Sequence, residues 1–579
     1  MKRPVAMLVL LAIAVFAAAP ASAGRRGASL RRGLDLSLDE PVRIPDGAKL
    51  TRATAALSSV TDDALSRSLL SGRITPAQFA LRRVQAAFDG TVKGVDLSLL
   101  LADLALRVRD LRGAERNRAL DLLARPTQNG PDNLDSGYSY RDATTEVDCG
   151  THFCVHWAED GRHRINLTDG ADENTLPDYV DAVHTTMEEV WAVEVDELGF
   201  DAPKSDVTSE NDDVPAQHAA KLDVYLLNSG ADGVYGYCGT DDPNLVDPFT
   251  TYPYWDGSSY CALDNDFAPS QFGGAPAAES LQVTAAHEFF HAIQLGYSAG
   301  HDSWMSEGTA ALLEDVVYDA IDDNYQYLSA SSLRQPNVPL NRNRNPYHYG
   351  AWLFWRYLTE LPSAPEAPAI GIDVIRETWE LAAFDGPAAP RLRSTFAVTK
   401  ALGDRDISFA NAKAFFSTVN FVPHLFYEEG AAYRTAVGGK APPAASFTLG
   451  GTRKKTGTRA GVLDHLTSAY VAFKPGAGVS NLRVAVDLPA AKTAPRATLL
   501  IMLADGTARH ASFEVDSTGF GLLDLNELGH EFTSASVQRV VLVLDNASTR
   551  MSKCQQVTPW SCGKPLDDDL QFAFAAQAS

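Results

Sequence analysis

The segment from residue 284 to residue 294 constrains the fold more than any other part of this 579-residue chain. It places His287 and His291 four residues apart among apolar and aromatic side chains. Residues four apart lie on the same face of an α-helix, so both imidazoles would project from one side of that helix. The segment therefore predicts a core helix that carries two histidines toward a common point.

Two histidines at this spacing are typical of one half of a zinc site. The pattern is H-E-x-x-H, and its glutamate, Glu288, lies beside the metal rather than on it. Zinc lowers the pKa of a bound water molecule to about 7, so hydroxide becomes accessible at neutral pH. We therefore predict one catalytic Zn²⁺ ion, with His287 and His291 as ligands and Glu288 as the general base that accepts the water proton.

A catalytic zinc site normally has a third protein ligand. The metzincin extension, H-E-x-x-H-x-x-G-x-x-H, is absent, because Gln294 and Tyr297 replace its glycine and third histidine. Asp302 lies in a stretch rich in Gly, Ser and Asp that is typical of an exposed turn. Glu307 begins a second predicted helix whose small residues would allow close packing on the first. We favour Glu307, with Glu314 as a fallback ligand or as the acceptor for a histidine N–H.

These two segments resemble a known group of enzymes. H-E-F-F-H-A-I-Q at 287–294, followed by W-M-S-E-G-T-A at 304–310, is similar to the gluzincin metallopeptidases, in particular the peptidase MA-like proteins with a W-x-x-E-G-x-A element. The resemblance implies zinc bound by His287, His291 and Glu307, with Glu288 catalytic. Only fifteen residues separate His291 from Glu307, fewer than in the better-known gluzincins, so the connection between the helices must be tight.

A wider stretch, residues 124–439, resembles a group of secreted bacterial metalloproteases. The matching segments are 124–127, 152–157, Asn174 with 177–180, and 259–267. The resemblance implies that a gluzincin-like zinc metallopeptidase domain occupies this part of the chain.

Peptide hydrolysis also needs a hydrogen-bond donor for the oxyanion that forms at the attacked carbonyl. Tyr347, His348 and Tyr349 stand together at the start of a helix predicted to run to Leu358. The gluzincin pattern has a tyrosine in a later helix, so we favour Tyr349 as a catalytic donor, with Tyr347 next. Simple aromatic packing at a helix start is the competing interpretation.

The chain begins with features of an exported protein. Lys2 and Arg3 precede an apolar run that ends in A-S-A at 21–23, the pattern of a cleavable secretory signal. We expect residues 1–23 to be removed and the mature protein to be secreted and extracellular. Residues 24–135 are predicted to be a helical N-terminal region or a pro-segment, with residues 97–111 as its clearest helix.

The remainder of the chain divides into two parts with different predicted secondary structure. We expect residues 136–440 to form the zinc metallopeptidase domain and residues 444–579 to form a β-sandwich accessory domain, because short strand-like runs recur there around a turn at Asp505-Gly506. The predicted fold class is therefore α+β and multidomain: a helical N-terminal region, a gluzincin-like zinc metallopeptidase domain and a C-terminal β-sandwich.

Cysteine spacing and charge limit the partners. Export makes disulfides the default, and nearest-neighbour pairing would join Cys149 to Cys154, Cys238 to Cys261 and Cys554 to Cys562. A net charge of −23 disfavours nucleic acid and anionic membranes as partners. After the signal, no segment is apolar enough for a membrane span. The sequence does not define the oligomeric state.

A second cofactor, Ca²⁺, has weaker support. Oxygen-bearing side chains cluster before a predicted helix at Asp169, Asp172, Asn174 and Asp178. Calcium binds such clusters, but the glycine of an EF-hand loop is absent, and acids often begin helices for other reasons. We favour helix capping over calcium binding.

The sequence thus predicts a secreted zinc metalloendopeptidase that acts on protein or peptide substrates. One alternative is a catalytically silent, zinc-containing extracellular binding or adhesion protein. Another is a zinc hydrolase of non-peptide substrates. Glu288 argues against a silent protein, because a structural zinc site needs no general base beside it.

Overall fold

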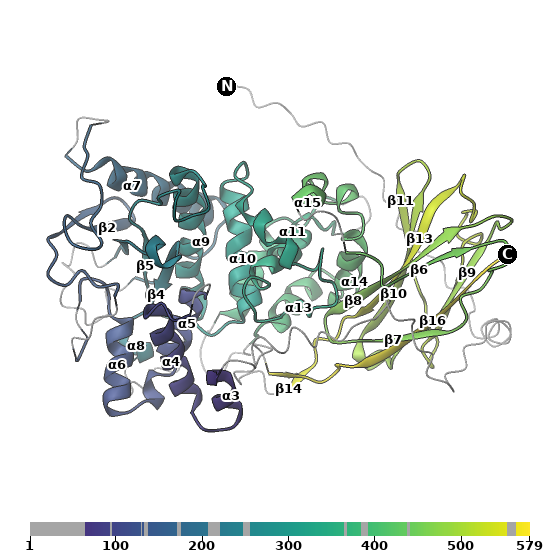
Figure 1. Ribbon diagram of the computed structural model, residues 1–579, viewed down its shortest axis with the longest axis horizontal. Coiled ribbons are helices and arrows are strands. Elements are labelled where there is room, and N and C mark those ends of the chain that lie inside the picture. Colours follow the sequence, from purple (N-terminus) through teal and green to yellow (C-terminus); the bar gives the residue numbers. More distant parts are fainter. Residues whose placement is uncertain are drawn as a thin grey trace.

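In the computed structural model the chain is a mixed α/β protein with several sheets (Figure 1). The structure describes residues 64–92, 95–128, 130–132, 137–170, 175–205, 220–246, 255–363, 367–383, 392–436, 441–552 and 563–579. The predicted signal, residues 1–23, lies outside these ranges, as do Cys554 and Cys562.

The first sheet has five strands in the order β1-β2-β3-β5-β4. Their bounds are Thr145–Cys149 (β1), Phe153–Ala158 (β2), Leu222–Leu227 (β3), Gly236–Gly239 (β4) and Tyr260–Asp264 (β5). Strands β2, β3 and β5 are parallel, whereas β1 and β4 are antiparallel edge strands. The central strand β3, predicted from its alternation, is buried at every position, as a strand covered on both faces must be.

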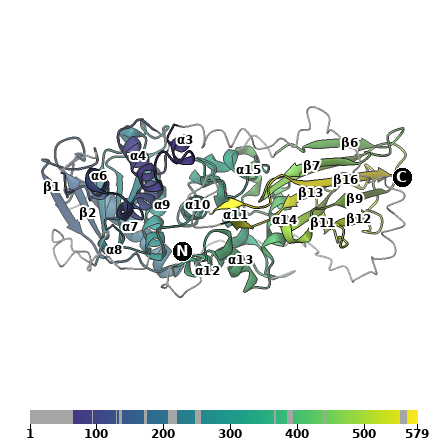
Figure 2. The same cartoon turned by 90° about the horizontal axis from the view of Figure 1, so that it is seen from below.

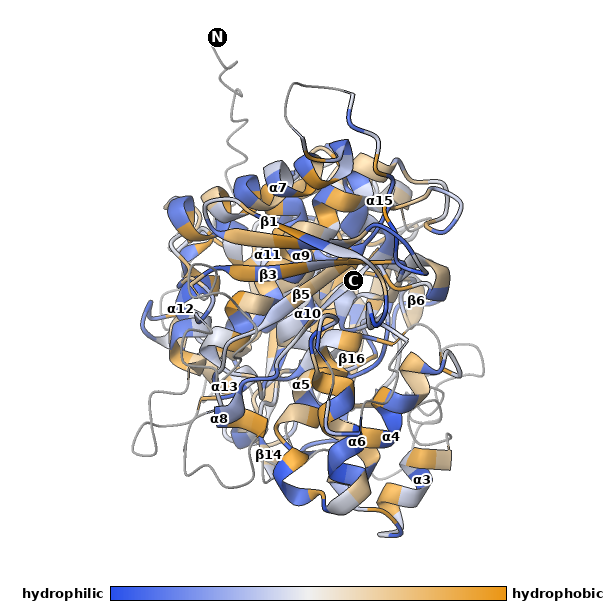
Figure 3. Cartoon of the chain, turned by 90° about the vertical axis from the view of Figure 1, so that its left-hand side faces the viewer, coloured by the Kyte–Doolittle hydropathy of each residue, from blue (hydrophilic) through white to orange (hydrophobic). Residues whose placement is uncertain are grey.

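Helices cover both faces of this sheet (Figure 3). On one face lie α7 (Asp178–Trp191), which continues as a π-helical turn (Ala192–Glu197), and α9 (Ala277–Tyr297). On the other lie α4 (Pro76–Phe88), α5 (Leu97–Ala105) and α6 (Gly113–Leu123). Because side chains alternate along a strand, Val224 faces the first layer of helices while Tyr225 faces the second.

A group of helices follows the sheet and occupies the middle of the molecule (Figure 2). Its α-helices are α10 (Ser303–Val317), α11 (Trp352–Glu360), α12 (Asp373–Ala382), α13 (Thr395–Gly403), α14 (Phe409–Val419) and α15 (Gly430–Ala436). Four fully buried tryptophans lie in the core that this group shares with α9: Trp304, Trp352, Trp355 and Trp379. The sheet and the central helices therefore share one core.

The C-terminal part consists mainly of two further sheets. The five-stranded sheet has the order β11-β10-β13-β8-β6 and the four-stranded sheet the order β12-β9-β16-β7. The strands are Ala445–Leu449 (β6), Arg459–Leu463 (β7), Thr467–Pro475 (β8), Leu482–Asp487 (β9), Pro495–Leu503 (β10), Ala508–Ser512 (β11), Phe520–Asp524 (β12), Val537–Asn546 (β13) and Leu570–Ala578 (β16). Both sheets contribute to one apolar core.

Helix α14 ties the central helices to the five-stranded sheet. Its Lys413 ammonium lies 3.0 Å from Oδ1 of Asp545 on β13, and both side chains are buried. Ser417, one turn along α14, donates a 2.7 Å hydrogen bond to the same oxygen. A buried charge of each sign is thus paired across this contact.

Two of the predicted disulfides are present. Cys149–Cys154 joins β1 to β2 and Cys238–Cys261 joins β4 to β5, each between residues directly opposite in the ladder. Among the described helices, none combines the length and apolar character that crossing a bilayer requires.

Candidate metal centre

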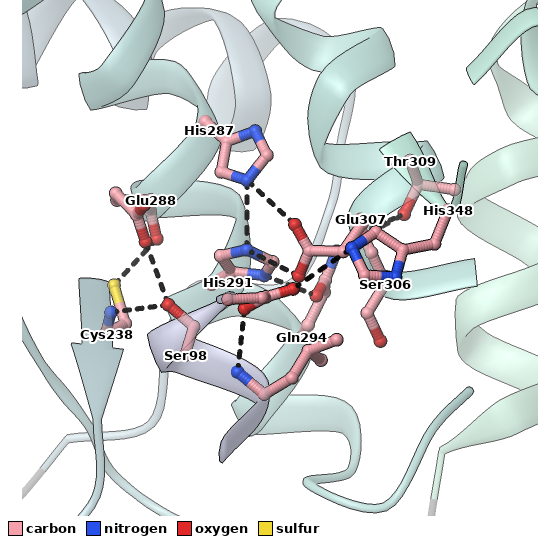
Figure 4. A network of polar contacts seen from close by, with 12 residues as sticks. Ser98, Cys238, His287, Glu288, His291, Gln294, Ser306, Glu307, Thr309 and His348 are labelled. Carbon is pink, nitrogen blue, oxygen red and sulfur yellow. Dashed lines mark hydrogen bonds and ion pairs between the residues drawn. The ribbon is translucent and has the colours of Figure 1, made fainter. Parts of the chain in front are cut away.

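Helix α9 presents the two predicted histidines. Almost every side chain from Ser280 to Leu295 is buried, so the helix is enclosed on all sides rather than lying at a surface. His287 and His291 are 7 % and 4 % exposed and project from the same side of α9 (Figure 4). The predicted core helix is confirmed.

Helix α10 brings the third residue. After a short connection, α10 begins at Ser303, and Glu307, in its second turn, is fully buried. Gly308 permits the close approach of α11, because a Cβ atom there would lie 2.8 Å from Nε1 of Trp355. That indole donates a 3.1 Å hydrogen bond to the carbonyl of Trp304. The W-x-x-E-G element thus packs α10 closely against α11, and this packing holds Glu307 in position.

Three side chains, two imidazoles and one carboxylate, converge at one point. Nε2 of His287 and Nε2 of His291 are 3.1 Å apart, and the Glu307 carboxylate lies 3.2 Å from the first and 3.3 Å from the second. Ligands 2.0–2.1 Å from a tetrahedral zinc ion stand about 3.3 Å from one another. The spacing of these atoms therefore fits a single ion of that size.

Outer hydrogen bonds orient both imidazoles. Nδ1 of His287 donates to Oε1 of Glu314 at 2.6 Å, and Nδ1 of His291 donates to Oε1 of Gln294 at 2.9 Å. The Gln294 amide is held in turn by its 2.9 Å hydrogen bond to the carbonyl of Ser306. When such a ring is neutral and its proton is on Nδ1, its Nε2 presents a lone pair to the common point.

The electrostatics of the three residues also suit a cation. Burial lowers the pKa of His287, but hydrogen bonds to Glu307 and Glu314 outweigh it and raise the pKa well above its usual value. Burial raises the pKa of Glu307, but the two histidines outweigh it and lower the pKa well below its usual value. Positive charge is therefore favoured here, and two imidazole nitrogens with one carboxylate form a donor set that zinc prefers.

Glu288 lies beside this set. It is 7 % exposed and accepts a 3.1 Å hydrogen bond at Oε2 from the hydroxyl of Ser98 on α5. Burial raises its pKa, which brings a carboxylate closer to the range useful for proton transfer near neutral pH. Strand β4 passes so close that a Cβ atom at Gly236 would lie 2.9 Å from Cγ of Glu288.

Tyr349 stands at the site and Tyr347 does not. The Tyr349 ring lies 5.7 Å from that of His287 and stacks on Tyr327 at 4.8 Å. Burial raises the Tyr349 pKa well above its usual value, so its hydroxyl remains a proton donor at neutral pH. Tyr347 instead donates a 2.9 Å hydrogen bond to the carbonyl of Val338.

The other residues considered as metal ligands lie outside the converging set or outside the described residues. Glu314 is the acceptor for His287 rather than a member of the converging set. Our expectation that Asp302 lies in an exposed turn is wrong: it is 8 % exposed, because it precedes α10 and packs beside Ser394 and Trp304. Of the acidic cluster considered for calcium, Asp172 and Asn174 lie outside the described residues.

Sequence reasoning did not identify three contributors. Gln294 holds His291, while Asp96 and Ser98 come from the N-terminal helices, roughly two hundred residues before the metal ligands. A signal existed for Gln294 alone: a polar residue one turn after His291 on an otherwise apolar helix. Contacts over such long sequence separations leave no local pattern.

A scan against protein-family profiles finds no match, and a search of curated proteins finds none either.

Proposed function

We propose that this protein is a secreted zinc-dependent metalloendopeptidase. The observation that carries the proposal is the convergence of His287, His291 and Glu307 within 3.3 Å of one another, with the buried carboxylate of Glu288 on the next position of the same helix. The resemblance of the two helical segments to gluzincins supports peptide rather than another substrate.

A bound zinc ion would supply an acidified water molecule and polarise the substrate carbonyl. The residues of the chain would then divide the remaining work. Glu288 accepts the water proton and can return it to the leaving amine. Tyr349, whose raised pKa keeps its hydroxyl protonated, donates to the oxyanion. His348, whose pKa burial lowers to about 4, is neutral at pH 7 and lies close to Glu307.

The same proposal extends to the organisation of the chain. We assign the signal to residues 1–23, a helical N-terminal region to 24–135, the metallopeptidase domain to 136–440 and a β-sandwich accessory domain to 444–579. Two sheets around one apolar core support the last assignment. Two disulfides agree with an oxidising, extracellular compartment.

Replacement of the general base tests the proposal. Glu288→Gln should retain zinc but cleave casein-derived peptides at least about 100-fold more slowly than wild type. Glu279→Gln is the matched control, because Glu279 lies on the exposed first turn of the same helix. Metal content and cleavage of a peptide library are measured on each purified protein.

The outcomes separate the alternatives. A wild-type protein that binds zinc and cleaves no peptide would support the silent binding protein. A protein that hydrolyses esters but no peptides would support a hydrolase of other substrates. Equal rates of peptide cleavage by wild type and Glu288→Gln would contradict the role of Glu288 as the general base.

A further inference from the structure

A hydroxyl group from the N-terminal helices lies against the general base of the proposed mechanism (Figure 4). Ser98, in the first turn of α5, is 7 % exposed and donates a 3.1 Å hydrogen bond to Oε2 of Glu288. The same hydroxyl accepts a 2.9 Å hydrogen bond from the backbone N–H of Cys238. Because an amide N–H can only donate, it takes a lone pair of the hydroxyl and leaves the single hydroxyl proton for Glu288. The fold therefore fixes the direction of this hydrogen bond.

The hydrogen bond leaves the Glu288 carboxylate prepared for proton transfer. Among the residues that the structure describes, Ser98 is the one donor of a hydrogen bond to this carboxylate, and it takes Oε2. The other oxygen, Oε1, remains available to accept a proton from water. A general base must lie within hydrogen-bond reach of that proton, and a displacement of about 1 Å costs on the order of 100-fold in rate. A donor that holds one oxygen of the base therefore bears on the chemical step.

The strand that holds Ser98 is itself restrained. Cys238 lies on the edge strand β4, and a disulfide joins it to Cys261 on the neighbouring strand β5. Through one hydroxyl, Ser98 links this strand to α9, the helix that carries Glu288. The hydroxyl therefore sets the position of the Glu288 carboxylate relative to the edge of the sheet.

Helix α5 belongs to the core of the sheet rather than to a detachable cover. Leu101 and Leu104 are fully buried in a core that also contains Tyr237 and Tyr260, from strands β4 and β5. Parallel strands are normally covered on both faces, and helices α4, α5 and α6 cover the second face of this sheet. Their removal would expose apolar surface to water, which is unfavourable.

A buried ion pair ties the end of the N-terminal region to the same sheet. The guanidinium of Arg125, which follows α6, contacts the carboxylate of Asp223 on β3, and both side chains are buried. Its Nε also lies 3.0 Å from Oδ2 of Asp241. Removal of one partner of a buried ion pair is strongly destabilising. Loss of the N-terminal region as far as residue 135 would therefore leave Asp223 without this cation.

We propose that Ser98 is a positioning residue for Glu288, and that helices α4, α5 and α6 are part of the active enzyme rather than a pro-segment that is removed. The hydroxyl orients one oxygen of the general base, and the helices bring that hydroxyl to a residue 190 positions later in the chain. This inference rests on the proposed function.

Removal of the hydroxyl tests the positioning role. Ser98→Ala should keep its zinc and unfold near the wild-type Tm, but kcat for casein-derived peptides should fall about ten-fold with KM little changed. The reason is that part of the roughly 10²- to 10⁴-fold contribution of a general base is lost. Ser98→Thr keeps the hydroxyl and should recover most of kcat. Ser280→Ala is the matched control, because Ser280 is a buried serine on α9 whose hydroxyl makes no hydrogen bond among the described residues.

Two further measurements separate positioning from a general loss of structure. If Ser98 acts through Glu288, Ser98→Ala should have no further effect on kcat in the Glu288→Gln protein, whereas independent effects would multiply. The role of the helices is tested by the intact mass of the secreted wild-type fraction that cleaves peptide. This fraction should retain residues 76–123, which span α4 to α6.

Each outcome supports or overturns a stated claim. A fall in kcat that Ser98→Thr reverses, and that is absent from Ser280→Ala and from the Glu288→Gln background, supports the positioning role. Wild-type or higher kcat in Ser98→Ala, or the same fall in the Glu288→Gln background, overturns it. An active fraction that begins after residue 123 overturns the assignment of the helices. In these cases wild type still cleaves peptide and the proposed function stands, whereas a wild type that binds zinc and cleaves no peptide overturns both.

Discussion

Helix α10 carries a buried acidic side chain near each end, and the groups that surround these two carboxylates differ. At the N-terminal end, the Glu307 carboxylate meets Nε2 of His287 and Nε2 of His291, whose other ring nitrogens face Glu314 and Gln294. At the C-terminal end, Asp315 lies close to Asp322 and Glu429, a group whose oxygens are also near enough to hold an ion. In both groups the possible ligand atoms lie within 4.8 Å of one another, so distance alone does not distinguish the two groups.

The difference lies in the donors that the protein provides. The guanidinium of Arg356, on α11, contacts the Asp315 carboxylate. The Tyr325 hydroxyl forms hydrogen bonds with Glu429 and Asp322. The second group thus contains a permanent protein cation, whereas the nitrogen atoms that face Glu307 belong to imidazoles, which can give up their proton to a metal ion. We infer that a group of ligand side chains binds a metal ion only where the protein places no permanent cation among them. We therefore expect one ion per chain, bound at the first group.

Loss of a ligand at each end is the strongest way to test this comparison. His291→Ala should lose bound zinc, with a fall in affinity greater than the 10- to 100-fold that even an outer hydrogen-bond partner contributes. Asp322→Asn should keep it, and asparagine tolerates the left-handed backbone of that residue, whose φ is 56°. Metal analysis after dialysis gives the number of ions per chain. Two ions in wild type, or loss of zinc from Asp322→Asn, would contradict the comparison.

Removal of the arginine tests the second end from the other side. Arg356→Met leaves the fully buried Asp315 side chain without its cation. Breaking a buried ion pair in this way costs about 3–5 kcal/mol. We expect a loss of that size in the free energy of unfolding, measured by denaturant titration, without loss of zinc.

A second substitution shows whether the cost comes from the stranded charge. Asp315→Asn in the Arg356→Met background removes that charge and should recover most of the stability. No recovery would mean that the arginine acts through packing, and a loss below about 1 kcal/mol would mean that Asp315 needs no partner.

The parts of this molecule that the sequence predicts are those with a local period. The four-residue spacing of His287 and His291 within an apolar run predicts α9, and alternation predicts β3. Cysteines opposite each other on neighbouring antiparallel strands are also close in sequence, so Cys149–Cys154 and Cys238–Cys261 could be paired by proximity. Each inference needs only a short stretch of chain.

The parts that the sequence does not predict depend on long-range packing. Asp96 carries an ordinary helix-start signal, and nothing in its surroundings shows that the cap lies against Glu307. Tyr347 and Tyr349 stand two residues apart in one aromatic segment, and the backbone direction before α11 places the first against Val338 and the second against His287. Gly236 is a similar case. A side chain at this position would collide with Glu288, which belongs to a different element, so the sequence around Gly236 does not reveal why glycine is required.

A third ionisable group, partly buried in the connection between α9 and α10, extends the comparison to a smaller expected effect. In the described part of the chain, no acidic side chain contacts the His301 ring. Its Nε2 donates a 3.1 Å hydrogen bond to the carbonyl of Ala382, and its ring packs against Trp379. Burial, aided by the positive charge of Arg393, lowers its pKa to about 3. If a buried charge needs a partner, this histidine must stay neutral in the folded protein.

The consequence is a loss of stability in acid. Between pH 6.5 and about 3 the unfolded chain binds a proton at His301 that the folded chain does not, so stability falls as the pH falls through that window. From pH 7 to pH 5 this group should account for about 1 to 2 kcal/mol of the decrease in the free energy of unfolding. His301→Gln removes the titration, so the variant should lose less stability than wild type over the same interval. Equal losses in the two proteins would show that His301 charges within the fold, and that a buried cation here does not need the partner that Asp315 finds in Arg356.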